Sequence, residues 1–181
     1  MYQPPLLARP NEVIIHAWSY QSLGMPLTHI GSGPATGVWP AIGLVIFVPF
    51  TLSEPLTVTK LWWDVAAQSG NADAGIYDAS QNLLLSAGTT VIGAATNIQS
   101  VDVTDTLIAR GQYYLALVAD NTTFSSRRSA PAAGICQALG LLEQTSVTLP
   151  LSTGASPATF AKYTRAYIPF FGLMGYRGIG P

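Results

Sequence analysis

The chain has 181 residues, a length that fits one domain with its own hydrophobic core. Charged residues make up 9% of it and apolar residues 49%, which excludes an intrinsically disordered chain. The net charge of −1 provides no basic field that would attract nucleic acid or anionic lipid, so we expect neither a nucleic acid nor a membrane as partner.

Cysteine use and the first residues bear on the class of protein. Cys136 is the only cysteine, which excludes a secreted domain held together by internal disulfides. The start of the chain, Met1 to Pro5, has no charged segment followed by an apolar stretch, so we expect no signal peptide. The longest apolar stretch, Val38 to Phe50, is too short to span a bilayer and contains two prolines.

Most of the chain predicts short β-strands. Three prolines in Met1–Asn11 indicate an extended N-terminal arm, and Gln21 to Gly37 is rich in Gly and Pro and indicates a long loop. In chain order, we expect strands over Glu12–Tyr20, Ile42–Phe50, Thr57–Val65, Ala72–Asp78, Asn82–Ala87, Ile98–Thr104, Gln112–Ala119 and Ala166–Phe171.

Two of these strands, Ile42–Phe50 and Gln112–Ala119, are apolar on both faces. Such strands are either buried on both sides or cover a contact between subunits. Pro49 marks the end of its strand or an edge of the sheet, because proline cannot donate to a ladder.

One helix interrupts the strands. Ser129 is a candidate N-cap, Pro131 suits a first turn, and Ile135, Leu139 and Leu142 repeat at helical spacing. The pattern predicts an all-β domain, a single antiparallel β-sandwich of jelly-roll type, with one short helix inserted before the last strands. We expect an N-terminal arm (residues 1–11), the sandwich (12–171) and an apolar, Gly-rich C-terminal tail (172–181).

The low charge predicts that part of the surface is buried against other subunits, since interface cores are depleted in charge. We expect a homo-oligomer, with a trimer as the expected state. Both ends of the chain are expected to dock on neighbouring subunits, with packing on their own domain as the alternative. The candidate assembly contacts are Tyr2, Leu6, Leu7, Phe170, Phe171, Leu173, Met174 and Tyr176.

No pattern of residues predicts an active site. His16 and His29 have no accompanying nucleophile motif, and the acidic residues show no pairing of the kind a glycosidase needs. Ca²⁺ binding would need several carboxylates together, but the spacing of the candidates matches no Ca²⁺ loop; they are Asp73, Asp78, Asp102 and Asp105. We therefore expect a protein that is not an enzyme, with no catalytic residues, no metal and no cofactor.

The pair Trp62 and Trp63 is the strongest candidate for a binding residue. Adjacent residues of a strand point to opposite faces, so one ring can fill the core while the other faces solvent, a second layer or a partner. We expect the outward ring to pack against another subunit. The alternative is that it forms an aromatic platform for a sugar.

Several segments together resemble small virion-associated proteins of tailed bacteriophages. They are Val38-Trp39-Pro40, Ile46-Phe47-Val48-Pro49-Phe50, Leu61-Trp62-Trp63, Gly75-Ile76-Tyr77-Asp78-Ala79, Val101-Asp102-Val103-Thr104-Asp105-Thr106 and Tyr113-Tyr114-Leu115-Ala116-Leu117. The resemblance implies a β-sandwich that is assembled in the host cytoplasm and displayed on the particle as an oligomer. Such proteins decorate the head, form head fibres, or belong to the tail and its receptor-binding parts.

The resemblance therefore leads us to expect a structural protein of the virion, on the head or tail, that contacts other virion proteins. The alternative is a carbohydrate- or receptor-binding module on a virion or cell surface, with a host-surface glycan as its partner.

Overall fold

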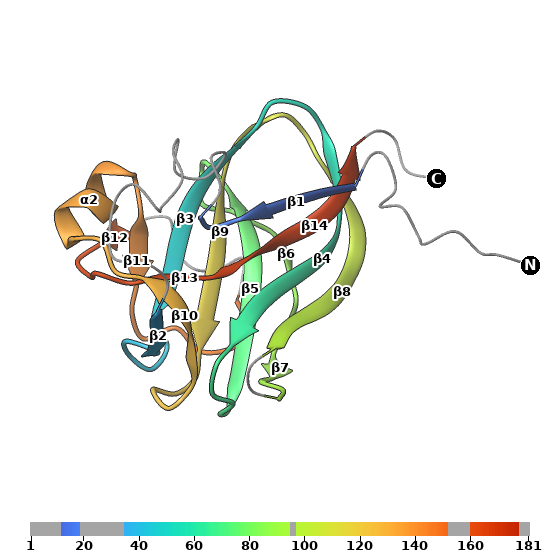
Figure 1. Ribbon diagram of the computed structural model, residues 1–181. Helices are drawn as coiled ribbons and strands as arrows, with labels where there is room; N and C mark the ends of the chain where they lie inside the picture. Colours follow the sequence, from blue (N-terminus) through green and yellow to red (C-terminus); the bar gives the residue numbers. More distant parts are fainter. Residues whose placement is uncertain (1–11, 19–34, 95–96, 152–159, 178–181) are drawn as a thin grey trace, which may run out of the picture.

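A computed structural model describes residues 12–18, 35–94, 97–151 and 160–177 of the chain. Apart from one helix, its regular structure is antiparallel β-sheet (Figure 1). In chain order the elements are β1 (Glu12–His16), β2 (Ala35–Val38), β3 (Val45–Leu52), β4 (Leu56–Val65), β5 (Asn71–Asp78), β6 (Leu83–Ser86), β7 (Thr90–Val91), β8 (Asn97–Ile108), β9 (Gly111–Ala119), β10 (Ser125–Ser129), α2 (Ala133–Ala138), β11 (Leu142–Gln144), β12 (Ala161–Lys162), β13 (Ile168–Pro169) and β14 (Phe171–Arg177).

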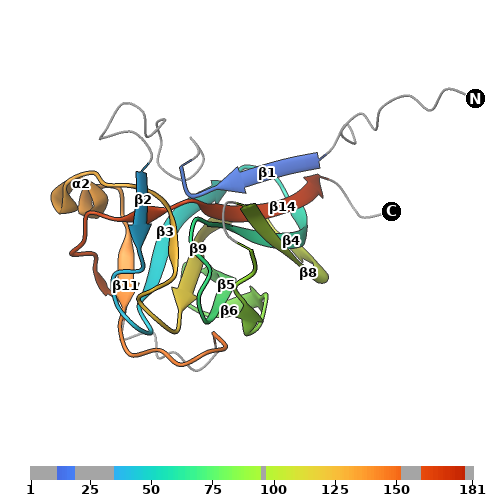
Figure 2. The ribbon, with the colours of Figure 1, turned by 60° about the horizontal axis from the view of Figure 1, so that its bottom comes forward.

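The strands form three sheets. A four-stranded sheet has the order β1-β14-β4-β8, and a three-stranded sheet has the order β13-β10-β2. The seven-stranded sheet has the order β12-β11-β3-β9-β5-β6, and β7 pairs with β5 beside that path. In Figures 1 and 2, β1 and β14 run across β3 and β9.

The main hydrophobic core lies between the four-stranded and seven-stranded sheets. Alternate residues of each strand point inward, so that Leu61 and Trp63 of β4 share one core with Ile46 of β3 and Leu117 of β9. These four side chains are completely buried. Burial of a large apolar side chain stabilises a fold by about 1.5–3 kcal/mol, so this layer provides much of the stabilisation.

The second face of the seven-stranded sheet is also covered by the chain itself. Val45 and Phe47 of β3 and Ala116 and Val118 of β9 belong to a smaller buried cluster, against which Phe160 packs. The ring of Phe160 stacks on that of Phe47 with 3.7 Å between centroids. The prediction that these strands are apolar on both faces is confirmed, but their second face does not need a neighbouring subunit to bury it.

Most of the expected strands are confirmed. The hairpin forms from β5 and β6, and β9 lies in the middle of its sheet between β3 and β5. Pro49 lies inside β3, beyond the three residues that pair with β11, so β3 has only β9 beside it there. The prediction of a local sheet edge at Pro49 is therefore correct, because the missing N–H removes no ladder bond.

The helix is shorter than the sequence predicted. Ser129 ends β10, the helix begins after Ala132, and Leu142 belongs to β11. Ser129 is therefore not the N-cap, since tertiary pairing with Ile168 in β13 places it in a strand. The strands β2, β7, β10, β11 and β12 were not expected, and β2 begins inside the stretch Gln21 to Gly37 that was expected to be a loop. No helix in the described ranges is long and apolar enough to span a membrane.

The largest correction concerns the C-terminal stretch. The expected tail begins at residue 172, but Gly172 to Arg177 belong to β14, which pairs with β1 on one side and β4 on the other. This part of the chain is a central strand of its own domain rather than an arm on a neighbour.

The all-β, antiparallel character is confirmed, whereas the jelly-roll topology stays a prediction. The expected N-terminal arm lies outside the described residues.

A truncation tests the place of β14. A chain that ends at Phe171 loses the ladders on both sides of β14 together with buried Leu173, whose loss alone costs about 2–5 kcal/mol. Because domains are stable by only about 5–15 kcal/mol, we expect this variant to be unfolded at 25 °C by far-UV circular dichroism. A chain that ends at Arg177 keeps β14 and is the control. Cooperative melting of the shorter variant near the control temperature would contradict this assignment.

Candidate functional site

The outer face of the four-stranded sheet carries an apolar patch made of Ile14, His16, Trp62, Ile98, Phe170 and Met174. The register brings these residues together, because Ile14 pairs with Met174 in the ladder between β1 and β14. Outward residues of antiparallel neighbours lie side by side on one face of a sheet. Ile14 and Ile98 are 55% and 48% exposed, so the patch reaches the surface of the chain.

The two adjacent tryptophans divide between the two faces of β4, as the strand geometry requires. Trp63 is 0% exposed and lies in the main core, while Trp62 points to the outer face and is 5% exposed. Trp62 packs edge-on against Phe170, with 5.0 Å between ring centroids. Its ring therefore forms part of the floor of the patch rather than a free-standing platform.

Further aromatic side chains extend this floor. Trp18 lies over Phe170 at 4.7 Å between centroids, and its Nε1 donates to the carbonyl of Ile168. The ring of His16 lies 5.4 Å from that of Phe170, and its Nδ1 accepts a hydrogen bond from the backbone N–H of Trp18. Burial lowers the pKa of His16 from its ordinary value near 6.5, so the imidazole is largely uncharged at neutral pH.

Gly172 makes this arrangement possible. It lies in β14 between His16 of β1 and Trp62 of β4. A Cβ at this position would lie 2.2 Å from the carbonyl oxygen of Ile15 and 2.8 Å from Cζ2 of Trp62. Because Gly172 has no side chain, the Trp62 ring can pack against the backbone of β14 at this position.

The other predicted assembly contacts are placed differently. Phe171 and Leu173 are fully buried in their own core and are not available to a neighbour, which corrects that expectation. Phe170 and Met174 are half-buried and belong to the patch. Tyr176 is half-buried, and its hydroxyl donates to Asp105. Tyr2, Leu6 and Leu7 lie outside the described residues.

The carboxylates have separate roles. Asp102 forms an ion pair with Lys60, and Asp78 accepts hydrogen bonds from the backbone and side chain of Asn82. Burial raises the pKa of Asp73, although hydrogen bonds from Ser86 and the N–H of Leu151 partly offset this effect. Among the described residues no three His, Cys, Asp or Glu lie close enough together to hold a metal ion.

One buried carboxylate lies directly beside the patch. Asp64 of β4 is 0% exposed and accepts a hydrogen bond of 2.6 Å from the backbone N–H of Arg127. Its Oδ1 lies 3.5 Å from Nη1 of Arg127, an ion pair whose geometry is too poor for a hydrogen bond. This contact links the four-stranded sheet to β10.

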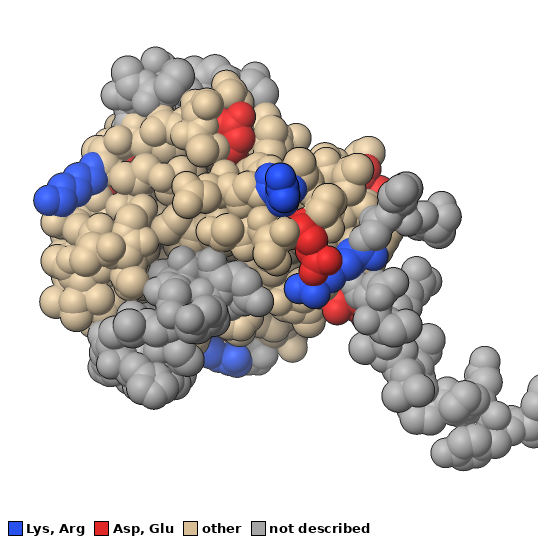
Figure 3. All heavy atoms as spheres, turned by 90° about the horizontal axis from the view of Figure 1, so that it is seen from above, with Lys and Arg blue, Asp and Glu red and all other residues tan. Residues whose placement is uncertain are grey.

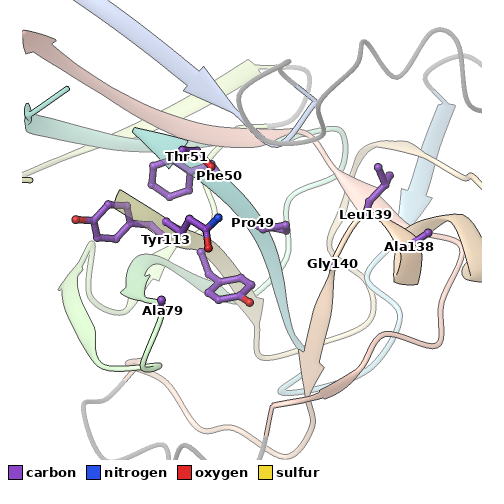
Figure 4. Close-up of a pocket in the computed structure, with 10 residues that line it drawn as sticks. Pro49, Phe50, Thr51, Ala79, Tyr113, Ala138, Leu139 and Gly140 are labelled. Carbon is purple, nitrogen blue, oxygen red and sulfur yellow. The ribbon is translucent and has the colours of Figure 1, made fainter. Parts of the chain in front are cut away.

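A second surface feature, a groove of about 240 Å³, crosses the seven-stranded sheet. Its sides come from Ala79 in the turn between β5 and β6 and from Gly140 after α2 (Figure 4). Thr51, Gln112 and Tyr114 line the groove as well. Sequence reasoning missed this groove, because it unites a turn, two strands and a helix end that are far apart in the chain.

Comparison with known protein families, with curated proteins and with solved structures found no match for this chain.

The role of Gly172 can be tested by adding one methyl group. We expect Gly172→Ala to lower the free energy of unfolding by about 1–3 kcal/mol, because the Cβ has backbone atoms on one side and Trp62 on the other. Urea unfolding followed by tryptophan fluorescence measures the change. Gly134→Ala is the matched control, since its Cβ meets nothing within 4 Å. Equal stability of the two variants would show that Gly172 is not closely surrounded by Ile15 and Trp62.

Proposed function

We propose that this chain is a structural, non-enzymatic component of a tailed-phage virion, assembled in the host cytoplasm and placed on the head or tail. It acts through protein–protein contacts, first with further copies of itself and then with other virion proteins. The expected oligomer is a trimer. The proposal rests on the sequence resemblance together with one structural observation, the apolar patch on the outer face of the four-stranded sheet.

The patch has the composition of a protein interface core. Its six residues are apolar or aromatic apart from the imidazole of His16, and aromatic residues and Met are enriched at protein interfaces. Two exposed isoleucines at its margin, Ile14 and Ile98, would lose their contact with water when a partner docks. Contiguous apolar surface of this kind favours a docking function.

The same composition argues against a sugar as the main ligand of the patch. A carbohydrate platform needs an accessible aromatic face with hydrogen-bonding groups beside it. Trp62 is only 5% exposed, and its neighbours Ile98 and Met174 are aliphatic. The alternative function is therefore not favoured at Trp62 and Trp63.

Charge beside the patch favours a second copy as the partner. Met174 of β14 pairs with Lys60 of β4, and Lys60 pairs in turn with Asp102 of β8. The two side chains form an exposed ion pair, with 39% and 81% of their surfaces accessible. A surface that holds both signs next to an apolar centre can pair with further copies of itself around a symmetry axis, Lys60 of each copy facing Asp102 of the next.

The remaining surface supports the same conclusion. Figure 3 shows Lys, Arg, Asp and Glu in a few small groups on the face seen from above, with wide uncharged areas between them. Charged residues make up 9% of the chain, against about 25% for typical soluble domains. A chain with so few charges depends on burial in an assembly to limit non-specific association.

Particles of a phage that encodes the chain provide the test. We expect the wild-type chain to co-sediment with purified particles and to be labelled on them by antibodies in electron microscopy. We expect Ile98→Asp to be lost from the particles and to dissociate the free oligomer in light scattering, because a carboxylate would be buried without a partner.

Leu107→Asp is the matched control, since Leu107 is 58% exposed on the same strand β8 but does not line the patch. We expect it to assemble normally. A wild-type chain that is absent from the particles would contradict the virion function. A chain present in the particles whose Ile98→Asp variant assembles as well as Leu107→Asp would contradict the role of the patch.

A further inference from the structure

We propose that the groove across the seven-stranded sheet is a binding site for a neutral carbohydrate. This site is separate from the apolar patch, which lies on the other sheet, and does not depend on the virion function. It also relocates carbohydrate binding from Trp62 and Trp63 to residues for which the sequence predicted no ligand.

The floor of the groove is formed by two pairs of residues that lie opposite each other on β3 and β9. Pro49 pairs with Tyr114, and Thr51 pairs with Gln112. Directly paired residues of an antiparallel ladder point to the same face, so these four side chains lie next to one another. In Figure 4 the turn at Ala79 and the segment Ala138–Gly140 stand on opposite sides of this floor.

The floor offers two kinds of contact that a sugar requires. The rings of Pro49 and Tyr114 provide an apolar surface for the C–H groups of a sugar ring. The hydroxyl of Thr51 and the amide of Gln112, both on exposed residues, can donate and accept hydrogen bonds. Together they match a ligand whose faces are apolar and whose edges carry hydroxyl groups.

The aromatic floor is held in place before any ligand binds. The ring of Tyr114 makes edge-on contacts with Phe47 and Phe160, each with 6.5 Å between centroids. These contacts fix the ring orientation, so little conformational entropy is lost on binding. The neighbouring Tyr113 packs against the main core on the opposite face of the strand, which leaves Tyr114 as the ring for stacking.

The side chains that line the groove disfavour ionic ligands. The described residues that line the groove include no Asp, Glu, Lys or Arg. Asp78 precedes Ala79 in the chain, but both its oxygens accept hydrogen bonds from Asn82, at 2.8 and 3.0 Å. A phosphate, a carboxylate or an ammonium group would have no opposite charge in the groove, whereas a neutral glycan needs none.

The size of the groove limits the ligand. Its volume of about 240 Å³ is below the range of about 300–1,000 Å³ that is typical of pockets for drug-sized molecules. A groove this small and open at the surface accommodates one sugar ring, with the rest of a glycan extending into solvent. We therefore expect modest affinity for a single site.

An array of neutral and anionic glycans, probed with the full-length chain, tests the proposal. We expect neutral glycans to bind and their sialylated or sulfated forms to bind no better. Isothermal titration with the strongest neutral hit should then show about a tenfold weaker affinity for Gln112→Ala, the loss expected for one hydrogen-bonding group. Ala79→Trp fills the groove from the turn and should abolish binding.

Both substitutions are at exposed residues, so melting temperatures should match that of the wild type. Thr104→Ala, at an exposed position of β8 on the four-stranded sheet, is the control and should bind as the wild type does. The proposal is overturned if no neutral glycan binds at millimolar concentration, if anionic glycans bind best, or if folded Gln112→Ala and Ala79→Trp bind with wild-type affinity. None of these outcomes bears on incorporation into particles.

Discussion

The structure depends on the position of β14 between β1 and β4, because its backbone pairs with both of these strands. Two glycines allow this close approach, since a Cβ on Gly172 would meet the carbonyl of Ile15 at 2.2 Å and one on Gly175 would meet that of Thr57 at 2.3 Å. The inner face of β14 then closes the core with Leu173, and its outer face presents Met174 to the apolar patch. One strand thus serves both the stability of the domain and the surface through which we propose it assembles.

The two sheets present surfaces of different chemistry. The outer face of the four-stranded sheet carries apolar side chains at exposed positions, which favours a protein partner. The groove on the seven-stranded sheet combines rings with hydroxyl and amide groups and has no charge among its described lining residues, which favours a neutral polar ligand. Because the surfaces belong to different sheets, a protein contact at one leaves the other open to a second ligand.

Strand periodicity predicted the fold class and the opposite orientations of Trp62 and Trp63, because both follow from local backbone geometry. It did not predict the place of Gly172 to Arg177. An apolar, Gly-rich stretch has the same composition whether it docks on a neighbour or pairs inside its own sheet, and the difference lies in long-range pairing to residues 12–16. The groove at Thr51, Gln112 and Ala79 was missed for the same reason, since only the fold brings these residues together.

Hydroxyl-radical footprinting of Met174 tests most directly whether the outer face is covered by a protein partner. The rate of oxidation at Met174 would be measured by mass spectrometry in the assembled protein and in the chain dissociated by Ile98→Asp, with exposed Leu107 as an internal reference. We predict a rate at Met174 that is several-fold lower in the assembly, with no change at Leu107. Equal rates at Met174 in the two states would mean that the patch stays open to solvent and would contradict the proposed assembly surface.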